Sequence, residues 1–178
     1  NGDFFYSMEI LYGGIPGRPI GDGMDGHSWW PLFENIPTEY LEAYYPLRID
    51  GYTTVTDSGG AGLHRGGNGV EKRYVYLEPG EVSIHDDRWL TPPWGVLGGE
   101  PGARSTKLLK RADGSEEVLP SKCDEVHVEP GDMLVFRTAG GGFAPVRIVG
   151  YQELTEFFCI SGCELCISGC EPGWKQCE

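Results

Sequence analysis

The chain has 178 residues, including 28 glycines and 13 prolines, and its 27 acidic residues against 14 basic ones give a net charge of −13. A surface this acidic repels phosphate backbones and anionic membranes, which argues against nucleic acid or a membrane as a partner. No apolar run approaches the roughly 18 residues that a membrane-spanning helix needs. The length fits one domain or one piece of a larger protein, and because the chain begins with Asn1 we expect that its start is missing.

In chain order, the sequence predicts a loop, an aromatic cluster and one short helix before any strand. Residues 13–26 form a Gly/Pro/Asp loop whose carboxylates are interpreted as turn residues; the alternative is a cation bound by Asp22, Asp25 and His27. The aromatic cluster at 27–33 is expected in the core or at an interface. Residues 37–45 are predicted as a helix that is stopped by Pro46. Its apolar stripe is formed by Ile36, Tyr40, Leu41 and Tyr44.

From Leu47 onward, apolar residues alternate with polar ones, which predicts short strands. The predicted strands are 47–55, 70–78, 81–87, the two arms of a hairpin around Asp113-Gly114, and two strands on either side of the turn 129–132. Short strands about ten residues apart with turn signals between them are typical of a sandwich or barrel. We therefore expect a mainly β fold with short helices, in the α+β class.

The densest candidate site is the loop 57–69, DSGGAGLHRGGNG. Consecutive backbone N–H groups in such a loop can form an anion-binding nest, and an arginine can bind a carboxylate or phosphate. The Gly-Lys-Ser/Thr ending of a P-loop is absent. The predicted substrate-binding residues are Asp57, Ser58, Gly59, Gly60, Arg65, Gly66 and Gly67. The alternative is a tightly packed turn in which the arginine pairs with a structural acid.

A second candidate site lies at the strand end 83–88, SIHDDR. On a strand, His85 and Asp87 point to the same face, and an imidazole beside a carboxylate can act as a general base or ligate a metal. Two ligands are too few for a metal site. We therefore predict His85 and Asp87 as catalytic residues and no metal site in this chain. The alternative is a strand end at which Asp86 or Asp87 pairs with Arg88.

Five stretches in a fixed order resemble motifs of the hydantoinase B/oxoprolinase family. They are GGIPGRPIGDGMDG at 13–26, NIPTEYLEAYYPLRI at 35–49, DSGGAGLHRGGNG at 57–69, HDDRWLTPPWGVLGGEPGARS at 85–105 and LPSKCDEVHVEPGDMLVFRTAGGG at 119–142. The chain is similar to the C-terminal portion of the family's B-type subunit. Residues 1–142 are therefore expected to be the C-terminal part of the hydantoinase B/oxoprolinase domain.

The resemblance implies a fragment of the B-type subunit of an ATP-dependent hydrolase that opens small cyclic amides, of the 5-oxoprolinase or N-methylhydantoinase type. The alternatives are a subunit of an ATP-dependent ketone carboxylase, of the acetone or acetophenone type, or a non-catalytic assembly piece. The resemblance also implies a cytoplasmic hetero-oligomer in which a hydantoinase A-type subunit or half binds ATP. A divalent metal is expected in the N-terminal region that this chain lacks, so the fragment alone is expected to be inactive.

The tail 143–178 departs from the family pattern. Five of the six cysteines lie in it, four of them in a seven-residue unit repeated as CISGCEL and CISGCEP, whereas residues 1–158 contain only Cys123. A single cysteine in that long stretch suits a reduced, cytoplasmic protein. The repeat is interpreted as out-of-frame or non-coding sequence that does not belong to the family fold. The alternatives are a zinc site and a set of disulfides.

Overall fold

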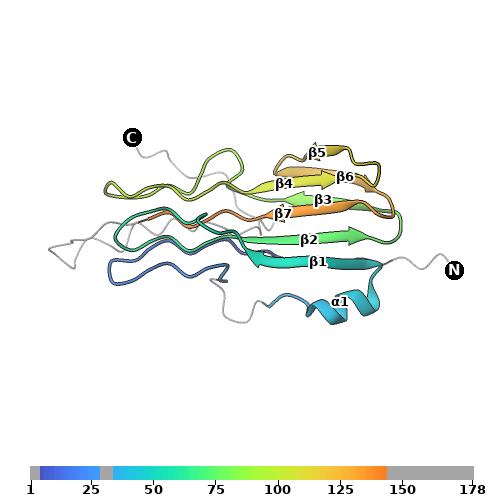
Figure 1. The fold of residues 1–178 in the computed structure, drawn as a ribbon, viewed down its shortest axis with the longest axis horizontal. Helices are drawn as coiled ribbons and strands as arrows, with labels where there is room; N and C mark the ends of the chain where they lie inside the picture. Colours follow the sequence, from blue (N-terminus) through green and yellow to red (C-terminus); the bar gives the residue numbers. More distant parts are fainter. Residues whose placement is uncertain (1–4, 29–33, 144–178) are drawn as a thin grey trace, which may run out of the picture.

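The computed structural model of the protein describes residues 5–28 and 34–143 (Figure 1). Its elements are α1 (Thr38–Tyr44), β1 (Leu47–Thr54), β2 (Val70–Tyr76), β3 (Gly80–His85), β4 (Thr106–Lys110), β5 (Glu116–Val118), β6 (Lys122–Val128) and β7 (Met133–Arg137). The predicted mainly β fold with a short helix is confirmed. The described part of the chain contains no helix with the length and apolarity to cross a membrane. Apart from Phe143, the predicted cysteine-rich tail lies outside the described residues, as does most of the aromatic cluster.

The strands form two antiparallel sheets. The larger sheet has the order β1-β2-β7-β4-β5, and β3 pairs with β6 in the smaller one. Both sheets are open, so the arrangement is that of a sandwich and not of a closed barrel. The buried core draws on both sheets and on the N-terminal segment; its members are Leu11, Ile84, Leu109, Leu119, Val128, Leu134 and Phe136.

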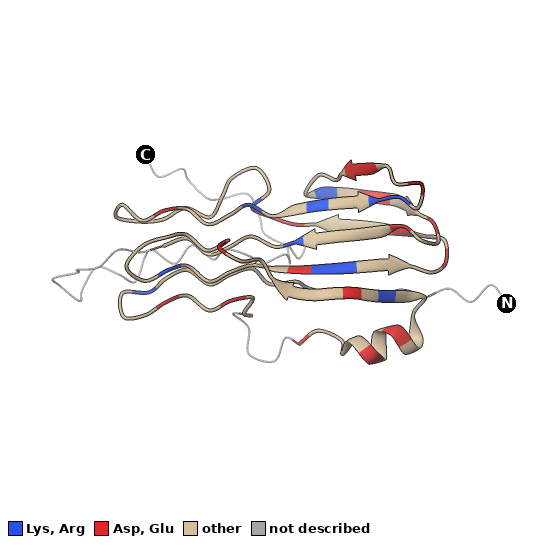
Figure 2. Ribbon diagram, viewed as in Figure 1, with Lys and Arg blue, Asp and Glu red and all other residues tan. Residues whose placement is uncertain are grey.

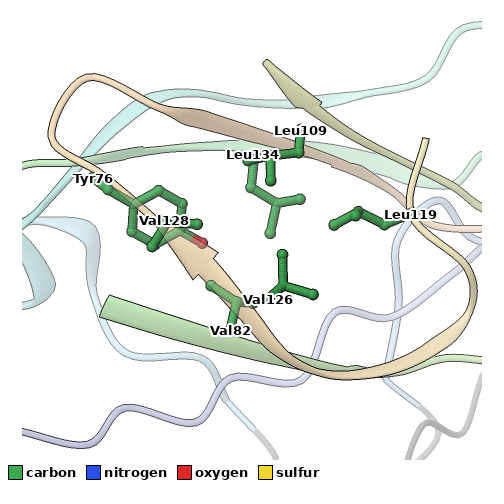
Figure 3. A pocket seen from close by; sticks show the side chains of 7 residues that line it. All are labelled: Tyr76, Val82, Leu109, Leu119, Val126, Val128 and Leu134. Atoms are coloured by element: carbon green, nitrogen blue, oxygen red, sulfur yellow. The ribbon is translucent and has the colours of Figure 1, made fainter. Parts of the chain in front are cut away.

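Apolar side chains from the two sheets point toward one another (Figure 3). Tyr76, Leu109 and Leu134 come from the five-stranded sheet, Val82, Val126 and Val128 from the two-stranded sheet, and Leu119 from the connection before β6. The gap between them leaves no room for a water molecule. The space between the sheets is therefore a packed core and not a ligand cavity.

The chain changes sheets at the turn 129–132. Strands flank this turn as predicted, but β6 pairs with β3 whereas β7 lies between β2 and β4. Asp132 holds the turn, because its buried carboxylate accepts hydrogen bonds from the N–H groups of Glu129 at 3.1 Å and Ala112 at 2.9 Å. Burial alone would raise the pKa of Asp132, but these N–H groups and the guanidinium of Arg111 outweigh it and lower that pKa. The turn is thereby tied to the hairpin of β4 and β5 that the sequence predicted.

Helix α1 lies beside the free edge of β1 (Figure 1). Leu41 is fully buried, and the carboxylate of Glu42 accepts a hydrogen bond of 2.7 Å from the N–H of Ile49, a backbone donor on the edge strand. The predicted apolar stripe is only partly buried, since Tyr40 is 52% and Tyr44 is 68% exposed. Because α1 lies at the edge of the sheet and not over its face, one helical position is enough to anchor it.

Candidate functional site

The long connections leave the sheets at the same end and run side by side there (Figure 1). We call them the glycine bundle, which consists of segments 13–26, 57–69, 93–103 and 138–143. Main-chain hydrogen bonds join these segments, for example from the N–H of Gly67 to the carbonyl of Ile15 at 2.7 Å and from the N–H of Gly60 to the carbonyl of Gly141 at 2.8 Å. Segments that are far apart in sequence thus form one hydrogen-bonded unit.

Glycine is required in this bundle by the distance between neighbouring backbones. A Cβ atom at Gly67 would lie 1.8 Å from the carbonyl oxygen of Met24, and one at Gly59 would lie 2.0 Å from the carbonyl oxygen of Gly66. The N–H groups of Gly59, Gly60, Gly66 and Gly67 donate to protein acceptors. The loop 57–69 is thus tightly packed against backbone, and substrate binding by its glycines stays a prediction.

Asp57 and Ser58 open the glycine loop. Asp57 has a φ of 56°, in the left-handed region that few residues other than glycine adopt. The buried hydroxyl of Ser58 donates to the carbonyl of Val55 at 2.7 Å and accepts from the N–H of Gly69 at 2.9 Å. Ser58 therefore holds the two ends of the loop together.

Arg65 lies on the surface of the bundle beside an acid of the first loop. Its guanidinium donates to both carboxylate oxygens of Asp25, at 2.8 and 3.4 Å, and Asp25 also accepts from the N–H of Asn68 at 2.7 Å. The Arg65 guanidinium lowers the pKa of Asp25. Arg65 is 46% exposed, so its orientation is fixed while part of the guanidinium remains accessible. Its predicted role as an anion partner stays a prediction.

His85 and Asp87 lie at the bundle end of the two-stranded sheet. Both are exposed whereas Asp86 between them is buried, so the predicted alternation continues past the end of β3. The Nε2 atom of His85 is 3.0 Å from Oδ1 of Asp124, and Oδ1 of Asp87 is 3.9 Å from Nζ of Lys122. Within the described residues, no hydrogen bond or ion pair joins His85 or Asp87 to the loop 57–69.

A buried polar cluster next to these residues was missed by reasoning from the sequence. Lys107 is fully buried, Asp86 is 4% exposed and Ser105 is 1% exposed. Lys107 forms an ion pair with Asp86 and donates to the hydroxyl of Ser105 at 3.1 Å, and that hydroxyl lies 2.6 Å from Oδ2 of Asp86. The sequence did contain one signal for this cluster. Lys107 is two positions before the core residue Leu109 on β4, and residues two apart on a strand lie on the same face of the sheet.

A second buried lysine lies across the sheet from the first. Lys72 on β2 is 1% exposed and donates to both carboxylate oxygens of Glu9, at 2.7 and 2.9 Å. Tyr74 donates to the same carboxylate at 2.8 Å, and burial together with the charge of Glu9 raises the pKa of Tyr74. Lys72 and Lys107 both pair in register with Phe136 of β7, so the two buried lysines lie on the strands that flank it. Nζ of Lys107 lies 5.1 Å from the centre of the Phe136 ring, whereas Nζ of Lys72 lies 5.0 Å from the centre of the Tyr74 ring.

Charged side chains lie both in the interior and on the surface of the sandwich. Figure 2 shows basic residues on β2 and β4, which include the two buried lysines, and acidic residues on α1 and β5.

Among residues 5–28 and 34–143, no three His, Cys, Asp or Glu side chains are grouped closely enough to hold a metal ion. The divalent metal that the family resemblance implies was expected in a preceding region of the subunit, and it stays a prediction.

Comparison with known proteins identifies the family. The sequence profile of the Hydantoinase B/oxoprolinase family matches residues 1–143. The chain is 33% identical over 141 residues to 5-oxoprolinase 1 of Arabidopsis thaliana, which is 79% of this chain and 11% of that protein. It is 30% identical over 146 residues to a Pseudomonas protein named as the B-type component of a D-/L-hydantoinase, covering 80% of this chain and 25% of that protein.

Two solved structures share the fold. An ATP-dependent caprolactamase from Pseudomonas jessenii is 26% identical with a TM-score of 0.57, over 76% of this chain and 24% of that one. A nucleotide-free acetone carboxylase is 17% identical with a TM-score of 0.58, over 71% of this chain and 21% of that one. The chain belongs to the hydantoinase B/oxoprolinase family. It spans between 11 and 25% of the length of these four relatives.

Proposed function

We propose that this chain is part of the B-type subunit of an ATP-dependent enzyme that opens a cyclic amide. The names of its relatives support this, since 5-oxoproline, hydantoins and caprolactam all contain an amide within a ring. The observation that carries the proposal is the likeness to the caprolactamase, which joins sequence identity to a shared fold over most of the chain. The acetone carboxylase, at 17% identity, supports the fold alone.

In this proposal, a hydantoinase A-type subunit or half binds ATP, which would activate the poorly reactive amide. The glycine bundle would be the rigid frame of the site, because the backbones pack so closely at Gly59 and Gly67 that no side chain fits there. Arg65, oriented by Asp25 and partly exposed, would bind a carboxylate or phosphate at the surface of that frame. His85, paired with Asp124, and its neighbour Asp87 would face the substrate or the subunit interface, where an imidazole beside a carboxylate suits general base catalysis.

The reaction class is tested with the full-length protein and its hydantoinase A-type partner. The complex is incubated with ATP and 5-oxoproline, hydantoin or caprolactam, and in parallel with acetone or acetophenone plus bicarbonate. The expected result is a ring-opened amino acid, or an N-carbamoyl amino acid from hydantoin, formed together with ADP and phosphate. Carboxylation of a ketone with no opening of any cyclic amide would contradict the proposal and identify the carboxylase branch.

The role of Arg65 is tested in the same complex by Arg65→Ala. We expect kcat/KM to fall at least about tenfold, the size of one lost charge-assisted contact of about 1.5 kcal/mol or more. Arg137→Ala is the matched control, because Arg137 is also exposed and paired with an acid, Glu71, but lies on β7 in the sheet. Equal values of kcat/KM for the Arg65→Ala variant and the wild type would remove Arg65 from the site.

A further inference from the structure

The connection between β3 and β4 is closed at its base by Ser105. The N–H of Ser105 donates to the carbonyl of Arg88 at 3.1 Å. Its hydroxyl lies 2.6 Å from Oδ2 of Asp86 and 2.9 Å from the carbonyl oxygen of Asp87. The hydroxyl has one proton to donate and accepts a second hydrogen bond from Lys107. The first three residues of the connection, 86–88, are therefore all in contact with Ser105, the residue that ends it.

Asp86 is held from three directions. Its N–H donates to the carbonyl of Ser121, before β6, at 2.8 Å, while its carboxylate contacts Ser105 and Lys107. Arg88, two residues later, has a φ of 62° and its guanidinium lies 4.5 Å from the centre of the Trp94 ring. A left-handed conformation at such a residue costs on the order of 1 kcal/mol or more and persists only where the surroundings determine it.

Stability alone gives a poor account of this cluster. Replacing a buried ion pair by apolar residues of similar volume is often neutral or stabilising, whereas removing one partner strands a charge. The pair of Lys72 and Glu9 provides an internal comparison. It is also a buried ion pair of a lysine and a carboxylate, and Lys72, like Lys107, pairs in register with Phe136. Glu9, however, fixes the N-terminal segment, whereas Asp86 immediately precedes Asp87 and the Arg88 turn.

We propose that Asp86, Ser105 and Lys107 are positioning residues that fix Asp87 and the Arg88 turn at the bundle end of the sandwich. This inference rests on the proposed function, in which Asp87 faces the substrate. The cluster acts through the main chain, because Ser105 contacts the carbonyl groups of Asp87 and Arg88 directly. Displacement of a catalytic group by about 1 Å can lower a rate by up to about a hundredfold.

The test uses the full-length complex with three variants. Ser105→Ala removes one hydroxyl and is the mildest change, Lys107→Met removes the buried cation, and Lys72→Met is the matched control on the other side of Phe136. For each we measure kcat and KM for the cyclic amide, the thermal unfolding midpoint, and amide hydrogen exchange of residues 87–104. We expect Ser105→Ala and Lys107→Met to lower kcat at least about tenfold, with little change in KM, and to speed exchange in 87–104. Lys72→Met should lower the midpoint while leaving kcat within about twofold of the wild type.

Two results would overturn the proposal. One is wild-type kcat and wild-type exchange of residues 87–104 in the Ser105→Ala variant. The other is an equal loss of kcat in Lys72→Met and Lys107→Met, which would make both lysines merely structural. A wild-type complex that opens no cyclic amide would instead refute the proposed function, and the exchange measurement would still decide whether Ser105 fixes the turn.

Discussion

Replacement of Gly67 by alanine tests the packing of the glycine bundle. The Cβ atom would lie 1.8 Å from the carbonyl oxygen of Met24 and 3.0 Å from the amide nitrogen of Ile15. Both neighbours are main-chain atoms, so no side chain can rotate away to make room. To reach a separation of even 3.0 Å, segment 13–26 must move away from segment 57–69.

That movement has a cost that can be worked from the contacts. It disrupts two hydrogen bonds between the segments, from the N–H of Gly67 to the carbonyl of Ile15 at 2.7 Å and from the N–H of Gly23 to the carbonyl of Arg65 at 2.7 Å. Each is worth about 1 kcal/mol, and overpacking typically costs about 1–3 kcal/mol more. We therefore expect Gly67→Ala to destabilise the protein by about 3–5 kcal/mol, a large part of the roughly 5–15 kcal/mol available to a domain.

The assay is urea unfolding followed by circular dichroism. With a slope of about 1–3 kcal/mol per molar urea, the expected loss lowers the midpoint by about 1 M or more, or prevents folding. Gly80→Ala is the matched control, because a Cβ atom there would meet nothing closer than a Val128 methyl at 3.8 Å, and its midpoint should stay near the wild-type value. If Gly67→Ala and the wild type unfold at the same urea concentration, the backbone contact does not require glycine and the reasoning fails.

Three further predictions concern the sandwich and can be checked by the same unfolding measurements. Asp132, whose pKa is lowered in the folded state, contributes stability that is present above its unfolded pKa of about 3.9 and is lost as pH falls through the folded value. Asp132→Asn should therefore lower the free energy of unfolding by about 2 kcal/mol at pH 7. The variant should also lose less stability than the wild type as the pH falls, and parallel curves of unfolding free energy against pH would contradict this. Leu41→Ala should cost about 3 kcal/mol because Leu41 is the buried residue of α1, whereas Tyr44→Ala should cost about 0.5 kcal/mol or less. Thr138→Val should cost about 1–3 kcal/mol, because its hydroxyl accepts from the N–H of Val70 at 2.8 Å in the buried base of the bundle, and an unchanged midpoint would show that this bond contributes little.

The strands and their turns were predictable because their signals are local. Alternation of apolar and polar residues marks which side of a strand faces the core, and Asp-Gly at 113–114 gave the hairpin of β4 and β5. The Gly114 backbone has a φ of 88°, which explains the glycine there. The number of glycines between 57 and 69 located the glycine loop and already indicated close backbone packing.

Pairing between distant segments was not predictable from the chain. β6 and β7 are joined by a short turn, yet they belong to different sheets, because the hydrogen bonds of each are satisfied by strands far away in sequence. The same holds for the partner of Arg65, since Asp25 lies 40 residues earlier. Neither composition nor periodicity specifies which of several acids an arginine will meet.

The sequence by itself determined the β fold, the places where the chain turns, and the concentration of glycine near the candidate site. Only the tertiary structure decided that Lys72 and Lys107 would be buried on either side of Phe136, each with its own carboxylate. Charged residues on a strand normally indicate a solvent-facing side, and burial becomes tolerable only once a distant acid is brought within ion-pair distance. That acid arrives through the folding of segments that no local pattern connects, which is why the buried ion pairs of Lys72 and Lys107 were visible in the structure alone.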